Sequence, residues 1–127
     1  MAESEYPHVE IHAIAWLADT TGKPVFTETD TALEASIPAS KVEVVGGSGS
    51  GLERTVLLEV DSFGKSRAAA WELGRENDAA MLRLATSGTP DWYVDDVRCT
   101  FHPSIQPYTN QALRRTSAIY ELTIRPR

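Results

Sequence analysis

Apolar and polar residues recur with two different periods along the chain, and the change of period marks the expected helices and strands. The segment from about Tyr6 to Asp19 fits a helix. Apolar side chains cover most of its helical wheel, while His8, His12 and Asp19 share one narrow polar stripe. A helix this apolar needs more than one neighbour. We expect the sheet to supply the first, and another subunit is a candidate for the second, with Trp16 at that interface.

The clearest strand covers residues 54–63, where apolar and acidic positions alternate. Its apolar side faces the core and its acidic side faces away: Val56, Leu58 and Val60 on the first, Glu59 and Asp61 on the second, with Leu57 beside the acids. Weaker patterns predict further strands over residues 25–27, 32–37, 41–45, 92–101 and 117–125. The run Gly46-Gly47-Ser48-Gly49-Ser50-Gly51 is too long for a two-residue hairpin turn and is expected to be a flexible loop.

A second helix is predicted from an N-cap at Ser66 to about Ala85. Glycine inside a helix costs about 1 kcal/mol relative to alanine, so we expect a packing reason for Gly74. Segment 87–90 closes this helix. Its core-facing stripe is Ala70, Leu73, Asn77, Ala80, Met81 and Leu84.

Strands grouped around two helices predict an α+β fold, in which a mostly antiparallel sheet of four to five strands packs with two α-helices. The chain has 127 residues, a length that fits one domain. We therefore expect residues 1–127 to form a single domain.

The amino-acid composition excludes some classes of partner and site. The chain has 12 Lys and Arg against 18 Asp and Glu, a formal net charge of −6, which argues against simple electrostatic binding to nucleic acid. Cys99 is the single cysteine, so no disulfide within the chain and no cysteine metal cluster is expected. The first twenty residues lack the pattern of a signal peptide, and no apolar run approaches 18 residues. We expect a protein made in the cytoplasm, without a membrane span.

Candidate catalytic chemistry is weak. His8 and His12 stand four residues apart and can share a metal, but HVEIH is not the zinc-protease pattern, and His102 is the only candidate for a third ligand. The glycine run lacks the GK[ST] ending of a phosphate-binding loop. Cys99 alternates with apolar neighbours and fits a small core residue better than a nucleophile. We predict no catalytic residue, no metal and no cofactor.

Charged and aromatic residues near the C-terminus are better candidates for contacts. Arg114 and Arg115 precede the last strand and can form ion pairs with Glu59, Asp61 or Glu121, within a subunit or between subunits. Tyr108 and Trp92 belong to the residue types enriched at interfaces. Closing the edge of the core explains these two aromatics equally well.

Several segments together resemble a known family. Pro107-Tyr108-Thr109-Asn110, Arg114-Arg115 and the strand from Ala118 to Arg125 resemble the C-terminal block of tail terminator proteins of long-tailed actinobacterial phages. The strand Val56–Gly64 and the following segment Lys65–Leu73 resemble that family's central strand and helix. The resemblance covers most of the chain through diffuse patterns, and segment 23–40 departs from it.

The resemblance implies a structural virion protein at the neck, assembled in the host cytoplasm. Such proteins form a ring, expected to be hexameric, that caps the head-proximal end of the tail tube, stops its polymerisation and joins the tail to the head. The partners are then further copies of the chain, the tail tube protein and a head-closure or neck protein. DNA passes through the lumen without specific binding, and an acidic lumen would favour this because like charges repel.

Exposure and charge suggest which residues make these contacts. The loops predicted to meet axial partners contain Gly46, Gly47, Ser48, Gly49, Ser50, Gly51, Gln106, Tyr108 and Asn110. The predicted ring interface or lumen contains Trp16, Glu59, Asp61, Asp95, Asp96, Arg98, Arg114, Arg115 and Glu121. Two alternatives remain open: another neck component, such as a head-closure or connector protein, and more remotely a small dimeric α+β ligand-binding domain or enzyme.

Overall fold

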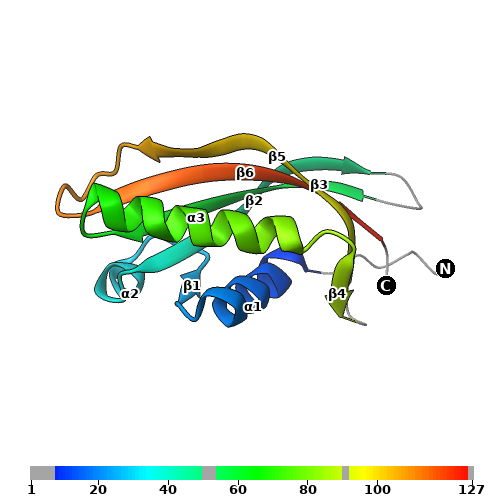
Figure 1. The fold of residues 1–127 in the computed structure, drawn as a ribbon, viewed down its shortest axis with the longest axis horizontal. Helices are drawn as coiled ribbons and strands as arrows, with labels where there is room; N and C mark the ends of the chain where they lie inside the picture. Colours follow the sequence, from blue (N-terminus) through cyan, green and yellow to red (C-terminus); the bar gives the residue numbers. More distant parts are fainter. Residues whose placement is uncertain (1–7, 50–53, 90–91, 126–127) are drawn as a thin grey trace.

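The computed structural model describes residues 8–49, 54–89 and 92–125. Three helices and six strands follow one another along this part of the chain (Figure 1). They are α1 (Val9–Thr21), β1 (Val25–Phe26), α2 (Thr31–Ala35), β2 (Ala39–Gly49), β3 (Arg54–Gly64), α3 (Arg67–Arg83), β4 (Ser87–Thr89), β5 (Trp92–Gln106) and β6 (Arg114–Ile124).

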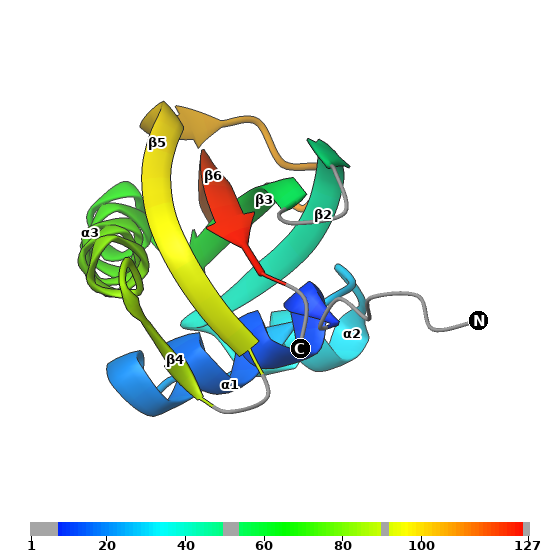
Figure 2. The same ribbon diagram turned by 90° about the vertical axis from the view of Figure 1, so that its right-hand side faces the viewer.

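The strands form one curled sheet in the order β1-β2-β3-β6-β5-β4 (Figure 2). The β1–β2 pair is parallel and the other pairs are antiparallel. The predicted α+β class is confirmed. The expected four to five strands and two helices were too few, because two very short strands extend the edges of the sheet and a short helix replaces a predicted strand.

The inner face of the sheet is covered by α3 and α1, and the main core lies between them and the long strands (Figures 1 and 2). The predicted stripe of α3 is buried as expected, and Ser66 caps the helix by accepting a hydrogen bond from the Ala69 N–H. Gly74 has the expected packing reason, since a Cβ there would lie 2.6 Å from Thr116 Oγ1. Buried Asn77 donates to the hydroxyls of Ser40 and Ser62, at 2.8 Å each, and so joins helix to sheet.

Helix α1 begins one turn later than predicted, with His8 as its N-cap, and Pro7 lies outside the described residues. It ends at Gly22, whose left-handed conformation (φ 72°) is easiest for glycine. Trp16 was expected at a subunit interface. Its indole is half-buried and donates a 2.9 Å hydrogen bond to the Ala80 carbonyl of α3, so this side chain joins two helices of its own subunit.

The segment predicted as a strand at residues 32–37 is instead helix α2. The Asp30 carboxylate caps this helix by accepting from the Leu33 N–H at 3.1 Å. Helix α2 covers the outer face of the sheet at one end, where Leu33, Ala39 and Phe63 form a second, smaller core with Tyr108 packed against it. Among the described residues, this is the end of the outer face that has its own apolar cover.

Two predicted loops are largely strand. β2 continues through Gly49, with a bulge between Val44 and Gly46, because β3 supplies backbone partners as far as Arg54. Ser50 and Gly51 lie outside the described residues. β5 likewise continues past its predicted end at residue 101 as far as Gln106, pairing with β6 past three register shifts, so Gln106, which was predicted in a loop, ends the strand.

Candidate functional site

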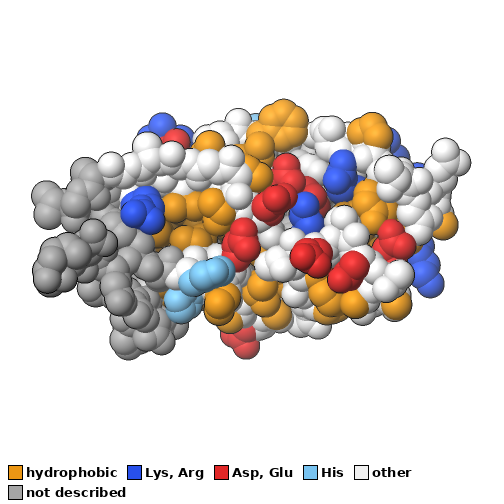
Figure 3. Space-filling model, turned by 180° about the vertical axis from the view of Figure 1, so that it is seen from behind, with side chains coloured by type: hydrophobic (Ala, Val, Ile, Leu, Met, Phe, Trp, Pro, Cys, Tyr) orange, Lys and Arg blue, Asp and Glu red, His pale blue; other side chains and the backbone are white. Residues whose placement is uncertain are grey.

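A charged cluster lies on the outer face of the sheet, beside the second core. Lys41 Nζ lies 3.1 Å from Glu43 Oε1, 3.6 Å from Asp61 Oδ2 and 3.9 Å from Glu59 Oε1. Lys41 and Glu43 are on β2, and the two other acids are on β3. Figure 3 shows acidic and basic side chains next to one another on the side of the molecule opposite to that seen in Figure 1. The Lys41 ammonium group therefore forms ion pairs with three carboxylates.

Asp61 is the most constrained member of this cluster. Its side chain is fully buried, and neither carboxylate oxygen has a hydrogen-bond partner within the described part of the chain. Lys41 and Arg115 approach it only at 3.6 and 3.7 Å. Asp61 was predicted to be on a ring or lumen surface, and this is wrong for its side chain in the isolated subunit. Glu59 is partly exposed, and burial followed by the charge of Asp61 raises its pKa above the usual value.

Arg115 holds the turn between β5 and β6. Its Nη1 faces Asp61, its Nη2 donates to the Pro107 carbonyl at 2.7 Å, and its guanidinium lies 5.7 Å from the ring centre of Tyr108. The predicted pair with Asp61 is thus confirmed, within one subunit. Arg114 Nη1 donates to the carbonyls of Gln111 and Leu113, at 2.7 and 3.1 Å. Both arginines therefore shape this turn.

A second set of contacts joins the same turn to α2. The Tyr108 hydroxyl donates to Glu34 Oε2 at 2.6 Å, and Asn110 Nδ2 donates to Glu34 Oε1 at 3.3 Å. The ring of Tyr108 meets that of Phe63 edge-on at 5.0 Å. Burial, followed by the hydrogen bond to Glu34, raises the pKa of Tyr108. Tyr108 and Asn110 therefore close the second core, while Gln106 donates to the Ser104 hydroxyl.

The remaining predicted charges lie along β5 and β6. Asp95 forms a bidentate ion pair with Arg125, in which Nη2 lies 2.7 Å from Oδ1 and Nε lies 2.8 Å from Oδ2. The pair lies beside the bulge between Val94 and Asp96. Asp96 and Arg98 are exposed, and Arg98 is the register partner of half-buried Glu121. Phe101, which no prediction singled out, is 47% exposed on β5.

The two segments predicted to meet axial partners lie at opposite ends of the long axis of the molecule. The glycine-rich end of β2 is at one end, and the turn between β5 and β6 is at the other, beside α2 (Figure 1). The strands β2, β3, β5 and β6 connect the two ends. The structure thus keeps the two segments apart, at opposite ends of the long axis.

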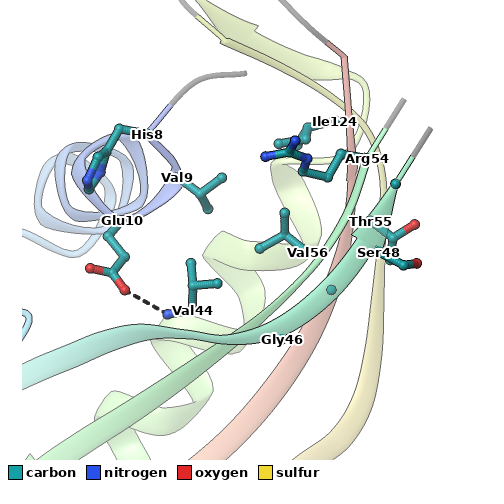
Figure 4. A pocket seen from close by; sticks show the side chains of 12 residues that line it. His8, Val9, Glu10, Val44, Gly46, Ser48, Arg54, Thr55, Val56 and Ile124 are labelled. Carbon is teal, nitrogen blue, oxygen red and sulfur yellow. Dashed lines mark hydrogen bonds between the residues drawn. The ribbon is translucent and has the colours of Figure 1, made fainter. Parts of the chain in front are cut away.

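A groove of about 670 Å³ lies between the start of α1 and the β2–β3 hairpin. Val9, Val56 and Ile124 contribute apolar side chains, and the Arg54 side chain points into the opening (Figure 4). Glu10 reaches across from α1 and accepts a 2.8 Å hydrogen bond from the Val44 N–H. Sequence reasoning missed this groove because its walls are far apart along the chain.

The residues considered for catalysis have other contacts. His8 caps α1, and His12 stacks on Trp92 with ring centres 5.2 Å apart. Among the described residues, no group of three potential ligands could hold a metal ion. Cys99 is half-buried, and burial raises the pKa of its thiol, which favours the less nucleophilic protonated form. In the same part of the chain, no helix is long and apolar enough to cross a membrane.

No family model matches the chain, and no curated protein is similar to it in sequence. Comparison with solved structures does find a relative in fold: a chain from the virion of a native gene transfer agent particle, with a TM-score of 0.60. The alignment covers 93% of this chain and 90% of the other, at 12% identity. At this identity the likeness is one of fold, and it extends over nearly the whole of both chains.

Proposed function

We propose that this chain is a structural virion protein, and specifically a tail terminator. Copies of it form a ring, which we expect to be hexameric, at the head-proximal end of the tail tube. The ring stops tube polymerisation and offers the surface that joins the head. The observation that carries the proposal is the fold shared, over nearly its whole length, with a chain from a gene transfer agent virion.

The arrangement of the two end segments supports an adaptor role. A terminator must meet the tube on one side and a neck protein on the other, and the two loops lie at opposite ends of the molecule (Figure 1). The turn between β5 and β6 is held by Arg115, Tyr108 and Glu34. Such a pre-organised surface loses little entropy on docking. It is therefore suited to a defined contact.

The outer face of the sheet is the proposed ring or lumen surface. Glu43 is exposed there, Glu59 and Glu121 are half-buried, and Phe101 on β5 is exposed. A ring needs contacts between different patches of neighbouring subunits, and such contacts close only at a fixed copy number. DNA would pass an acidic lumen without adhering.

A matched pair of variants tests this assignment. Phe101 on β5 and Leu82 on α3 are 47% and 48% exposed, so an aspartate at either site leaves the core intact. We expect Phe101→Asp to prevent ring assembly and Leu82→Asp to leave it unchanged, as measured by analytical ultracentrifugation and imaging. Loss of ring assembly in Leu82→Asp alone would show that the interface lies on the side of the molecule that carries α3.

Another neck component, such as a head-closure or connector protein, is the alternative, because it would also form a ring in the virion. Binding experiments distinguish a terminator from a head-closure protein. A terminator should bind purified tail tubes that lack heads, whereas a head-closure protein should bind DNA-filled heads that lack tails. We also propose that the chain is not an enzyme.

A further inference from the structure

The groove beside α1 runs along a free edge of the sheet. β1 pairs only with Ser40 and Lys41 of β2, and no other described strand pairs with that edge from residue 42 to 49. An unpaired edge presents backbone N–H and C=O groups to any strand that can reach them. The hydrogen bond from the Val44 N–H to Glu10 shows that one such donor points away from β3 and toward α1 (Figure 4).

Residues 46–49 of β2 are exposed among the described residues, and three of these four residues are glycines. Gly47 and Gly49 pair with Val56 and Arg54, residues that line the groove. Glycine within a strand often marks a place where another backbone approaches closely. Gly47 also has a φ of 151°, and a Cβ on it would lie 2.3 Å from the Thr55 carbonyl oxygen, so glycine alone fits this position.

The floor of the groove suits alternate side chains of an extended peptide. Val9 and Val56 are nearly buried and Ile124 is fully buried, while Val44 on the rim is 39% exposed. In an extended strand every second side chain points to the same face, so apolar residues at alternate positions would meet this floor. The positively charged Arg54 side chain lies at the opening, and the planar guanidinium group of arginine matches the geometry of a carboxylate.

We propose that this groove binds an extended segment of another protein, which adds a strand to the free edge of β2. The segment carries apolar side chains at alternate positions and a carboxylate where it meets Arg54. The Glu10 carboxylate competes with this segment for the Val44 N–H, because a carbonyl group of the incoming strand must replace the carboxylate as the acceptor. The inference does not depend on the terminator role, since it follows from the groove alone.

A synthetic peptide tests the proposal. The probe is acetylated Thr-Val-Thr-Val-Thr-Val-Glu, added to the full-length protein labelled with ¹⁵N. We expect saturable shifts and slowed hydrogen exchange at the backbone amides of residues 44–49. The control peptide has the same side chains but N-methyl groups on alternate amides, and it should bind at least tenfold more weakly, because strand addition needs backbone hydrogen bonds.

Variants of the protein test the two walls of the groove. Glu10→Ala should tighten binding of the probe threefold or more, because it removes the competitor for the Val44 N–H. Gly49→Val should weaken it at least tenfold by filling the groove, since the nearest atoms to a Cβ there belong to Arg54, at 3.2 Å. Glu72→Ala, at an exposed position on α3, is the control that should leave the affinity unchanged.

Three results would overturn the proposal. One is equal binding of the N-methylated peptide. Another is no saturable shift at residues 44–49 in both wild type and Glu10→Ala. The third is protection of these amides by self-association without peptide, which would assign the edge to a second copy of the chain. Because none of these results involves tail tubes, failure here is separate from failure of the terminator role.

Discussion

On the inner face of the sheet, buried Asn77 donates two 2.8 Å hydrogen bonds to serine hydroxyls, whereas on the outer face buried Asp61 makes none within the described residues. Two helices cover the inner face with an extensive apolar core, while the described part of the chain covers the outer face with α2 and one turn, at one end. A buried carboxylate without hydrogen bonds is costly, and contacts of 3.6 and 3.7 Å with cations offset this only in part. The inner face thus fixes the fold, and the outer face is where a partner can change the environment of charged groups.

The largest expected contrast comes from two adjacent leucines. Leu58 is fully buried on the inner face, so Leu58→Ala should cost about 2–5 kcal/mol of unfolding free energy. Leu57 faces outward and is half-buried, so Leu57→Ala should cost less than about 1 kcal/mol. Urea unfolding of the isolated protein measures both. Equal costs would show that the two faces do not differ in packing as described.

Gly74→Ala should be the next largest effect. The added methyl group would lie 2.6 Å from Thr116 Oγ1, and such overpacking costs about 1–3 kcal/mol. Thr116→Ala removes the clashing atom, so the double variant should recover part of the loss relative to the sum of the singles. Strictly additive losses in thermal unfolding would contradict this account of Gly74.

The contact between α2 and the β5–β6 turn should contribute less. Tyr108→Phe keeps the ring against Phe63 but removes the 2.6 Å hydrogen bond to Glu34, at a cost of about 0.5–1.5 kcal/mol. We also expect faster hydrogen exchange in the turn at residues 107–113. Unchanged exchange there would mean that Glu34 does not hold the turn.

The smallest effect concerns Glu59, whose pKa is raised by burial and by Asp61. A raised pKa means that the folded state favours the protonated carboxyl group of Glu59. Ionised Glu59 therefore lowers the stability of the folded protein at neutral pH. This destabilisation disappears as the pH falls through the raised pKa to below 4.5, the ordinary value. Glu59→Gln should therefore stabilise the protein slightly at pH 7. The difference from wild type should shrink below pH 4.5, and a difference independent of pH would contradict the assignment.

Local patterns predicted the inner face well and the outer face poorly. The stripe of α3 and the alternation in β3 are read directly from neighbouring residues, and both are confirmed. Helix α2 was missed although Asp30 is a good N-cap, because five residues carry too little periodicity to distinguish helix from strand. The burial of Asp61 was also missed, since alternation placed it on the solvent side.

The wrong predictions for the glycine-rich end of β2 and for Asp61 share a physical cause. Gly46, Gly47 and Gly49 disfavour a strand on their own, but β3 supplies their hydrogen-bond partners through pairing. Asp61 is packed beside Lys41 and Arg115, residues 20 and 54 positions away in the sequence. Both outcomes depend on contacts between distant segments, and a pattern read along one segment does not contain them.

We propose that the chain caps tail tubes as a ring. The most direct test is negative-stain imaging of the purified protein, alone and mixed with tail tubes of the virion to which we propose it belongs. We predict rings of six subunits in the first sample, or a cap at one end of each tube in the second. A compact monomer or dimer that leaves both tube ends bare would contradict the terminator role.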